Sequence, residues 1–107
     1  LHDQFLKALF GRREIDRPRR LVLIVGVVDV GAVGPLRVIQ AFMPLLKNSS
    51  MTAMIANITS EAGSIGACYR SNMIDYAMAK AALNMGTMNL VNTFKDDPQI
   101  NIFRIAI

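Results

Sequence analysis

The chain has 107 residues, a hydrophobic fraction of 52% and a formal net charge of +4 at neutral pH. This length allows one domain at most, and so apolar a composition excludes an intrinsically disordered chain. A single cysteine, Cys68, and a single histidine, His2, exclude an internal disulfide and a structural zinc site. Because the sequence shows no signal-peptide pattern and no apolar run as long as a membrane span, we expect a cytoplasmic protein.

The first segment, residues 1–20, predicts a basic N-terminal arm ahead of a domain over 21–107. It holds six basic side chains against three acidic ones. Its apolar residues between Phe5 and Phe10 predict a short amphipathic helix, and Pro18 breaks any longer one. A basic segment can bind nucleic acid or an anionic membrane. This one has few aromatic side chains to stack on bases, which favours a solvated arm.

Residues 21–28, LVLIVGVV, form an apolar, β-branched run that predicts a strand. Apolar residues recur every three to four positions over 35–47 and predict a helix that begins at Pro35. The glycines of this region are Gly26, Gly31 and Gly34. A strand, a glycine loop and a helix would suit a phosphate cradle over 21–42, but glycine spacings of five and three fit no dinucleotide fingerprint. We rank that alternative last.

Four segments follow. Residues 52–59 predict a buried strand, 60–72 a loop rich in Gly and Ser, 74–94 a helix that ends before Pro98, and 100–107 a strand. The order β-α-β-α-β with continuously apolar strands predicts an α/β fold, a Rossmann-like parallel sheet with helices on both faces. Three strands are about half of a doubly wound domain.

The periodicity also assigns a buried face to each helix. In 35–47 the expected buried residues are Leu36, Ile39, Met43 and Leu46, widened by Val38, Phe42 and Leu45. In 74–94 they are Ala77, Ala81, Ala82, Met85, Met88, Leu90 and Val91. A chain this short and apolar is expected to expose apolar surface that a partner or a longer protein would cover.

The sharpest local pattern is YAMAK, in which Tyr76 and Lys80 lie four residues apart on one helix face. An ammonium beside a phenol favours the phenolate, which makes a usable acid/base. The spacing is also that of a common surface pair. Its setting adds specificity, because a strand ending in NITS and a glycine-containing loop precede it. Ser60 taken alone reads as a strand-end serine that caps backbone groups.

Three segments in order resemble the short-chain dehydrogenase/reductase family. MIANITSEAGSIG and YAMAKAALNM resemble its active-site strand, loop and following helix. GPLRVIQAFMPLLKNS resembles the preceding helix in the branch related to carbonyl reductases and C-factor-like proteins. The resemblance covers roughly residues 27–107. It implies the C-terminal portion of a doubly wound domain, truncated at both ends.

The resemblance implies roles for three residues. Tyr76 would be the catalytic acid/base. Lys80 would favour its phenolate and hold the nicotinamide ribose, and Ser60 would hydrogen-bond the oxygen of the substrate. The reaction would be hydride transfer between NAD or NADP and a small carbonyl or secondary-alcohol substrate. Thr59 and Ser64 are neighbouring hydroxyls that could be mistaken for Ser60.

Several features of the family are absent from this sequence. The Gly-x-x-x-Gly-x-Gly, Asn-Asn-Ala-Gly and Pro-Gly segments are missing, and Gly31 stands where the family has an asparagine that holds a proton-relay water. Because hydride transfer needs the nicotinamide at close range, we expect negligible activity from this chain alone. The alternative is a non-catalytic relative that dimerises through the helices near 35–47 and 74–94, as such helices pair in the family.

Overall fold

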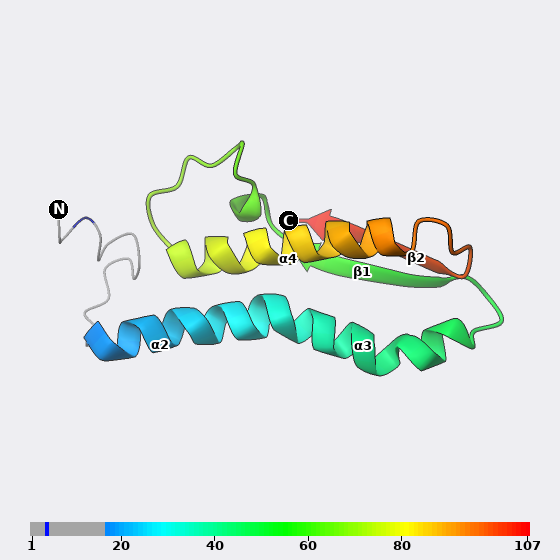
Figure 1. Ribbon diagram of the computed structural model, residues 1–107. Coiled ribbons are helices and arrows are strands. Elements are labelled where there is room, and N and C mark those ends of the chain that lie inside the picture. The colour runs from blue at the N-terminus through cyan, green and yellow to red at the C-terminus, as the bar shows by residue number, and fades with distance from the viewer. Residues whose placement is uncertain (1–3, 5–16) are drawn as a thin grey trace.

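The computed structural model describes residue 4 and residues 17–107 (Figure 1). Its elements are helix α2 (Arg17–Val28), the π-helical turn η1 (Asp29–Val33), helix α3 (Gly34–Lys47), strand β1 (Ala53–Thr59), the 3-10 turn η2 (Glu61–Gly63), helix α4 (Ile74–Thr93) and strand β2 (Ile100–Ala106). The elements α2, η1 and α3 form one long helical rod, which runs alongside α4. The short helix expected near Phe5 lies outside the described residues, and α2 begins within the expected arm.

Strands β1 and β2 pair in parallel, in a register that runs from Ala53 opposite Ile100 to Thr59 opposite Ala106. Helix α4 connects them, which makes a β-α-β unit. The α/β fold with a parallel sheet and flanking helices is confirmed. The elements expected near 35–47, 52–59, 74–94 and 100–107 are all present, with boundaries shifted by a residue or two.

The strand expected over 21–28 is wrong, because this segment is helical. Ile24, Ala32 and Ile39 recur seven to eight residues apart and are the buried residues of the rod. Helix propensities of Val and Ile lie only some tenths of a kcal/mol below that of Ala, so packing outweighs them. The phosphate-cradle alternative fails with the strand, because the glycines of this region lie inside the rod rather than in a loop.

The π-helical turn explains how the rod passes Pro35 without a break. Proline has no N–H to donate four residues back to Gly31, which would interrupt an ordinary helix at this point. Here the Gly34 N–H donates to the Asp29 carbonyl five residues back. An ion pair of 3.0 Å between Asp29 and Arg37 spans the same turn. The helix expected to begin at Pro35 is therefore the second half of a longer one.

The core lies between α3, α4 and one face of the sheet. Its buried members are Ile39, Ile55, Ile100 and Ile102, and Met43, Leu46, Leu90, Val91 and Phe94 pack against them. The burial expected for Ile39, Met43 and Leu46 is therefore confirmed. The remaining residues expected on that face, Leu36, Val38, Phe42 and Leu45, are exposed. The buried stripe of α3 is thus narrower than its apolar pattern suggests.

The buried face of α4 differs from the expected one. Its buried residues are Ala79, Leu83 and Thr87, whereas Ala82, Met85 and Met88 are exposed, and Ala77, Ala81, Leu90 and Val91 are half-buried. The polar member Thr87 is fully buried because its hydroxyl is satisfied twice. It accepts from Asn57 Nδ2 at 2.9 Å and donates to the Leu83 carbonyl at 2.7 Å. Counting apolar residues cannot detect a core position of this kind.

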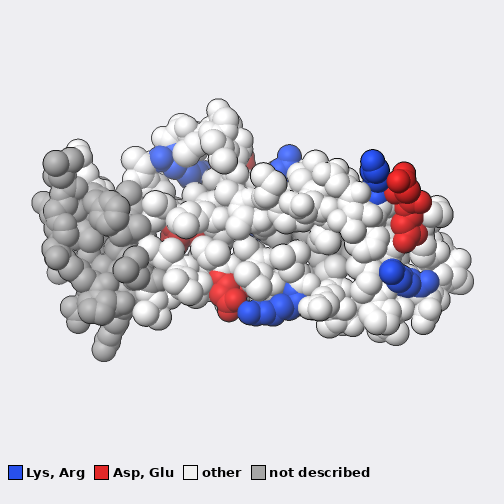
Figure 2. Space-filling view, in the orientation of Figure 1, with Lys and Arg blue, Asp and Glu red and all other residues white. Residues whose placement is uncertain are grey.

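In the part of the chain that the structure describes, helices cover one face of the sheet. Strand β1 alternates, with Ile55 and Asn57 buried while Met54 and Ile58 face outward, and Ile105 of β2 is exposed. The expectation of helices on both faces is not met within these residues. Figure 2 shows few charged side chains on the visible face of the molecule. The exposed side chains of Met54, Ile58 and Ile105 leave apolar surface open on the sheet.

The rod also corrects the expectation about membrane-spanning length. The uninterrupted apolar run of residues 21–28, on which that expectation rested, is too short to cross a bilayer. As one helix, the 26 residues Val22–Lys47 are long and apolar enough to cross a membrane by length and composition, and only 17% of the apolar window is buried. The same residues pack on α4, so length and composition do not decide the environment of the rod.

Gly63 of η2 lies against the backbone of α4 and gives a test of this packing. A Cβ at Gly63 would lie 2.5 Å from the Lys80 carbonyl carbon, whereas a Cβ at Gly66 would meet nothing within 4 Å. We expect Gly63→Ala to lower the free energy of unfolding by about 2 kcal/mol or more, because backbone must move. Gly66→Ala is expected to stay within about 0.5 kcal/mol of the unsubstituted chain. Urea denaturation followed by circular dichroism measures both, and equal losses would contradict the packing described.

Candidate functional site

The carboxyl end of β1 carries three hydroxyl side chains with different environments. Ser60 has extended backbone, is 6% exposed, and its Oγ accepts from the Ala62 N–H at 3.1 Å. It therefore caps η2, as the simpler interpretation of this serine anticipated. Its hydroxyl hydrogen can still be donated to another oxygen. Thr59 is 2% exposed and its Oγ1 has no partner, while Ser64 accepts from the Ala67 N–H.

Lys80 links α4 to the end of β1. Its Nζ donates to the Ile58 carbonyl at 3.2 Å, two residues before Ser60. The same ammonium lies 5.6 Å from the centroid of the Tyr76 ring, within the range of a cation–π contact. Tyr76 and Lys80 thus share one helix face, as their spacing predicted. Sequence reasoning missed the Ile58 carbonyl, because no side-chain pattern marks a backbone acceptor.

Tyr76 lies in the first turn of α4 and is 38% exposed, so its phenol can be reached from solvent. The residue before the helix, Met73, has φ 55° and lies in the left-handed region. That conformation costs a non-glycine residue roughly 1–2 kcal/mol. Asp75 then accepts from the Tyr76 N–H at 2.8 Å. The entry of α4 is therefore held in a defined turn rather than left to fray.

Gly31, which stands at the position of the family asparagine, lies in η1, inside the rod. A Cβ there would lie 3.1 Å from the Ala79 Cβ. Ala79 is buried and precedes Lys80, so the rod and α4 cross closely beside the candidate site. A side chain at position 31 would require the rod or Ala79 to shift by a few tenths of an ångström.

A contact that sequence reasoning missed joins the two ends of the loop after β1. Arg70 Nη2 donates to Glu61 Oε1, and the guanidinium lies 5.1 Å from the centroid of the Tyr69 ring. The hydrogen bond with Glu61 is the main reason that the pKa of Arg70 is raised above its ordinary value, against the opposing effect of desolvation. A loop has no periodicity, so nothing in the sequence indicated this pair.

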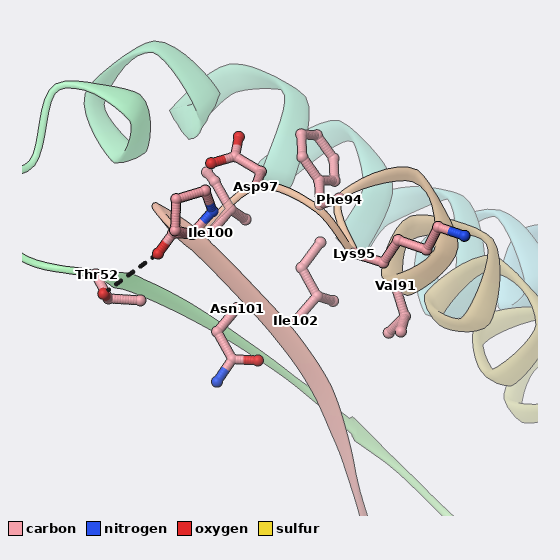
Figure 3. Close-up of a pocket in the computed structure, with 9 residues that line it drawn as sticks. Thr52, Val91, Phe94, Lys95, Asp97, Ile100, Asn101 and Ile102 are labelled. Carbon is pink, nitrogen blue, oxygen red and sulfur yellow. Dashed lines mark hydrogen bonds between the residues drawn. The ribbon is translucent and has the colours of Figure 1, made fainter.

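Two cavities among the described residues 17–107 adjoin α4. One, of about 420 Å³, is lined by Thr59, Ser60 and Ser64 together with side chains of α4 and β2, but by neither Tyr76 nor Lys80. The other, of about 490 Å³, lies where α4 ends and the strands begin, and Figure 3 shows its lining, with Thr52 donating to the Pro98 carbonyl. This second cavity contains none of the candidate residues. Only the first adjoins a residue with a proposed chemical role.

Comparison with known proteins gives a consistent family. No family model matches the chain. The chain is 35% identical over 75 residues to 1-hydroxy-2-glutathionyl-2-methyl-3-butene dehydrogenase of Rhodococcus sp. (strain AD45). The aligned segment covers 70% of this chain and 32% of that protein. The chain is 32% identical over 73 residues to C-signal of Myxococcus xanthus, and that alignment covers 68% of this chain and 43% of C-signal.

A solved structure supports the same assignment. A Burkholderia xenovorans protein whose crystal structure is assigned to the short-chain dehydrogenases/reductases superposes with a TM-score of 0.68 at 28% identity, over 86% of this chain and 35% of that one. The chain spans between 32% and 43% of the length of these proteins. In sequence and in fold, this chain is a relative of the short-chain dehydrogenase/reductase family.

Proposed function

We propose that this chain carries the acid/base part of a short-chain dehydrogenase/reductase site. Tyr76 exchanges a proton with the substrate oxygen, and Ser60 donates its hydroxyl hydrogen to the same oxygen. Lys80 stabilises the phenolate that forms when Tyr76 gives up its proton. The substrate class is a small carbonyl compound or the matching secondary alcohol, and the setting is cytoplasmic.

One observation carries this proposal. The Lys80 ammonium donates to the Ile58 carbonyl at 3.2 Å and lies 5.6 Å from the Tyr76 ring centroid. A surface lysine would extend into water, because its ammonium is strongly hydrated. Here it bridges the tyrosine and the strand end that carries Ser60. This position, between the tyrosine ring and the strand end, supports a role for the ammonium in stabilising the phenolate.

The hydrogen-bond donors of the site suit the nicotinamide–ribose half of NAD or NADP. An ammonium has three donors, and the contact with Ile58 uses one, which leaves donors for ribose hydroxyls beside the Tyr76 hydroxyl. When bound, NAD(P)H supplies the hydride. No counterpart for the pyrophosphate is present in the described residues, since Gly26, Gly31 and Gly34 all lie within a helix. We therefore propose that the chain binds the nicotinamide end of NAD or NADP weakly and that, by itself, it has negligible catalytic activity.

Binding of nicotinamide mononucleotide tests the site without requiring turnover. We expect dissociation constants of about 1 mM or weaker, equivalent to about 4 kcal/mol, with amide resonance shifts near Ile58, Tyr76 and Lys80. Lys80→Met is expected to abolish these shifts, and Lys95→Met, on the remote cavity, to leave them unchanged. Shifts that persist in Lys80→Met, or that are absent from the unsubstituted chain, would contradict the proposal.

Turnover is a separate measurement. Oxidation of NADH or NADPH with a panel of aldehydes and ketones is expected to remain at the rate without protein, and Tyr76→Phe to be indistinguishable from the unsubstituted chain. A saturable rate that falls at least about 100-fold in Tyr76→Phe would overturn the proposed inactivity while supporting the role of Tyr76. A saturable rate that is indifferent to Tyr76→Phe would contradict both.

A second function, self-association through the helices, is favoured by the exposed apolar surface of the rod. Val38, Phe42 and Leu45 follow a helical spacing on α3 and are 54–68% exposed. On α4, Met85 is exposed as well. A face of this kind is unfavourable in water. We propose a homodimer in which α3 and α4 pack against their counterparts, which is the association the family resemblance implies.

Light scattering over a concentration series tests the dimer. We expect twice the chain mass at high concentration, and a shift to the monomer in Phe42→Glu, because a buried carboxylate would oppose association. The control is Ile65→Glu, at a loop residue that is 88% exposed and away from the helices. A monomer at all concentrations, or equal effects of the two substitutions, would exclude this interface.

A further inference from the structure

We propose that Glu61 and Arg70 form a clamp that holds the loop between β1 and α4, and so set Ser60 relative to Tyr76. The inference rests on the proposed function in one respect only, the roles of Ser60 and Tyr76. Glu61 directly follows Ser60, and Arg70 lies six residues before Tyr76. The ion pair therefore closes the loop that connects Ser60 to Tyr76, and the separation of these two residues matters for proton exchange. Glu61 and Arg70 are positioning residues, not catalytic ones.

The ion pair between Glu61 and Arg70 is the one polar contact of this loop, among the described residues, that spans most of its length. The other hydrogen bonds of the loop are local, from Ser64 to the Glu61 carbonyl, from Ala67 to Ser64 Oγ, and from Cys68 to the Ile65 carbonyl. Among residues 17–107, no other hydrogen bond given by the structure joins 66–72 to residues before 64. Without the clamp, only the left-handed turn at Met73 and local contacts would direct the chain into α4.

The surroundings of Arg70 strengthen the pair. Its side chain is 29% exposed, against 49% for Glu61, so solvent screens the contact only in part. The guanidinium lies against the Tyr69 ring, which limits its conformations. Glu61 is the main cause of the raised pKa of Arg70, and Tyr69 and Tyr76 act in the same direction.

Amide hydrogen exchange in Glu61→Gln tests the clamp. This substitution keeps the size of the side chain and removes its charge. Exchange of the Ala67 and Cys68 amides, which donate to Ser64 Oγ and to the Ile65 carbonyl, is expected to accelerate about two- to fivefold, as for the loss of one partly exposed ion pair. The matched control is Asp29→Asn, which removes the charge from the Asp29–Arg37 pair on the rod. It is expected to leave the loop unchanged. Amides in the core of α4, followed in the same samples, correct for any loss of global stability.

Charge reversal separates an electrostatic clamp from simple packing. Glu61→Arg combined with Arg70→Glu is expected to return loop exchange to within about 1.5-fold of the unsubstituted chain at low salt, and to lose this protection at about 1 M salt, where charges are strongly screened. The proposal is overturned if Glu61→Gln leaves exchange unchanged, if Asp29→Asn accelerates it equally, or if reversal restores nothing. Since no nucleotide is used, failed nicotinamide binding with an intact clamp would count against the proposed function alone.

Discussion

The position of α4 on the sheet depends on one buried hydrogen bond, from the Asn57 side-chain amide to the Thr87 hydroxyl. The bond is 2.9 Å long, and Thr87 is fully buried. Leaving either group unpaired in the core would cost about 1–3 kcal/mol. A slide of α4 by one turn, about 5.4 Å, would separate them, whereas apolar neighbours such as Leu83 tolerate small shifts. The polar pair therefore favours one register of α4 on β1.

The geometry of the candidate site follows from that register. Lys80 lies about two turns before Thr87 on α4, and its ammonium reaches the carbonyl of Ile58, which follows Asn57 on β1. Glycine at position 63 allows η2 to lie against the backbone of Lys80 and Ala81, since a Cβ there would lie 2.5 Å from the Lys80 carbonyl carbon. The core bond and the close approach of η2 thus act on the same segment of α4. Tyr76 is placed by the helix that they hold.

Residue patterns indicated the elements better than the contacts between them. The apolar strands and the helix with Tyr76 and Lys80 could be predicted, because their periods and their stops are local properties of the chain. The helical state of 21–28 could not, since Ile24 is buried by packing that overrides β-propensity. Thr87 was missed because it is polar. The lysine's acceptor was missed because it is a backbone atom 22 residues away in sequence.

Gly31 shows how the same packing constrains the chemistry that this chain can support. An asparagine at this position would place its Cβ 3.1 Å from that of Ala79, closer than ordinary van der Waals contact. Ala79 is buried and directly precedes Lys80, so a side chain at position 31 would require a shift of a few tenths of an ångström beside the turn that carries the ammonium. In this chain the ammonium is held by the Ile58 carbonyl, a contact that needs no side chain from the rod. The close helix crossing therefore disfavours a side chain at position 31, whereas the direct contact between Lys80 and β1 requires none.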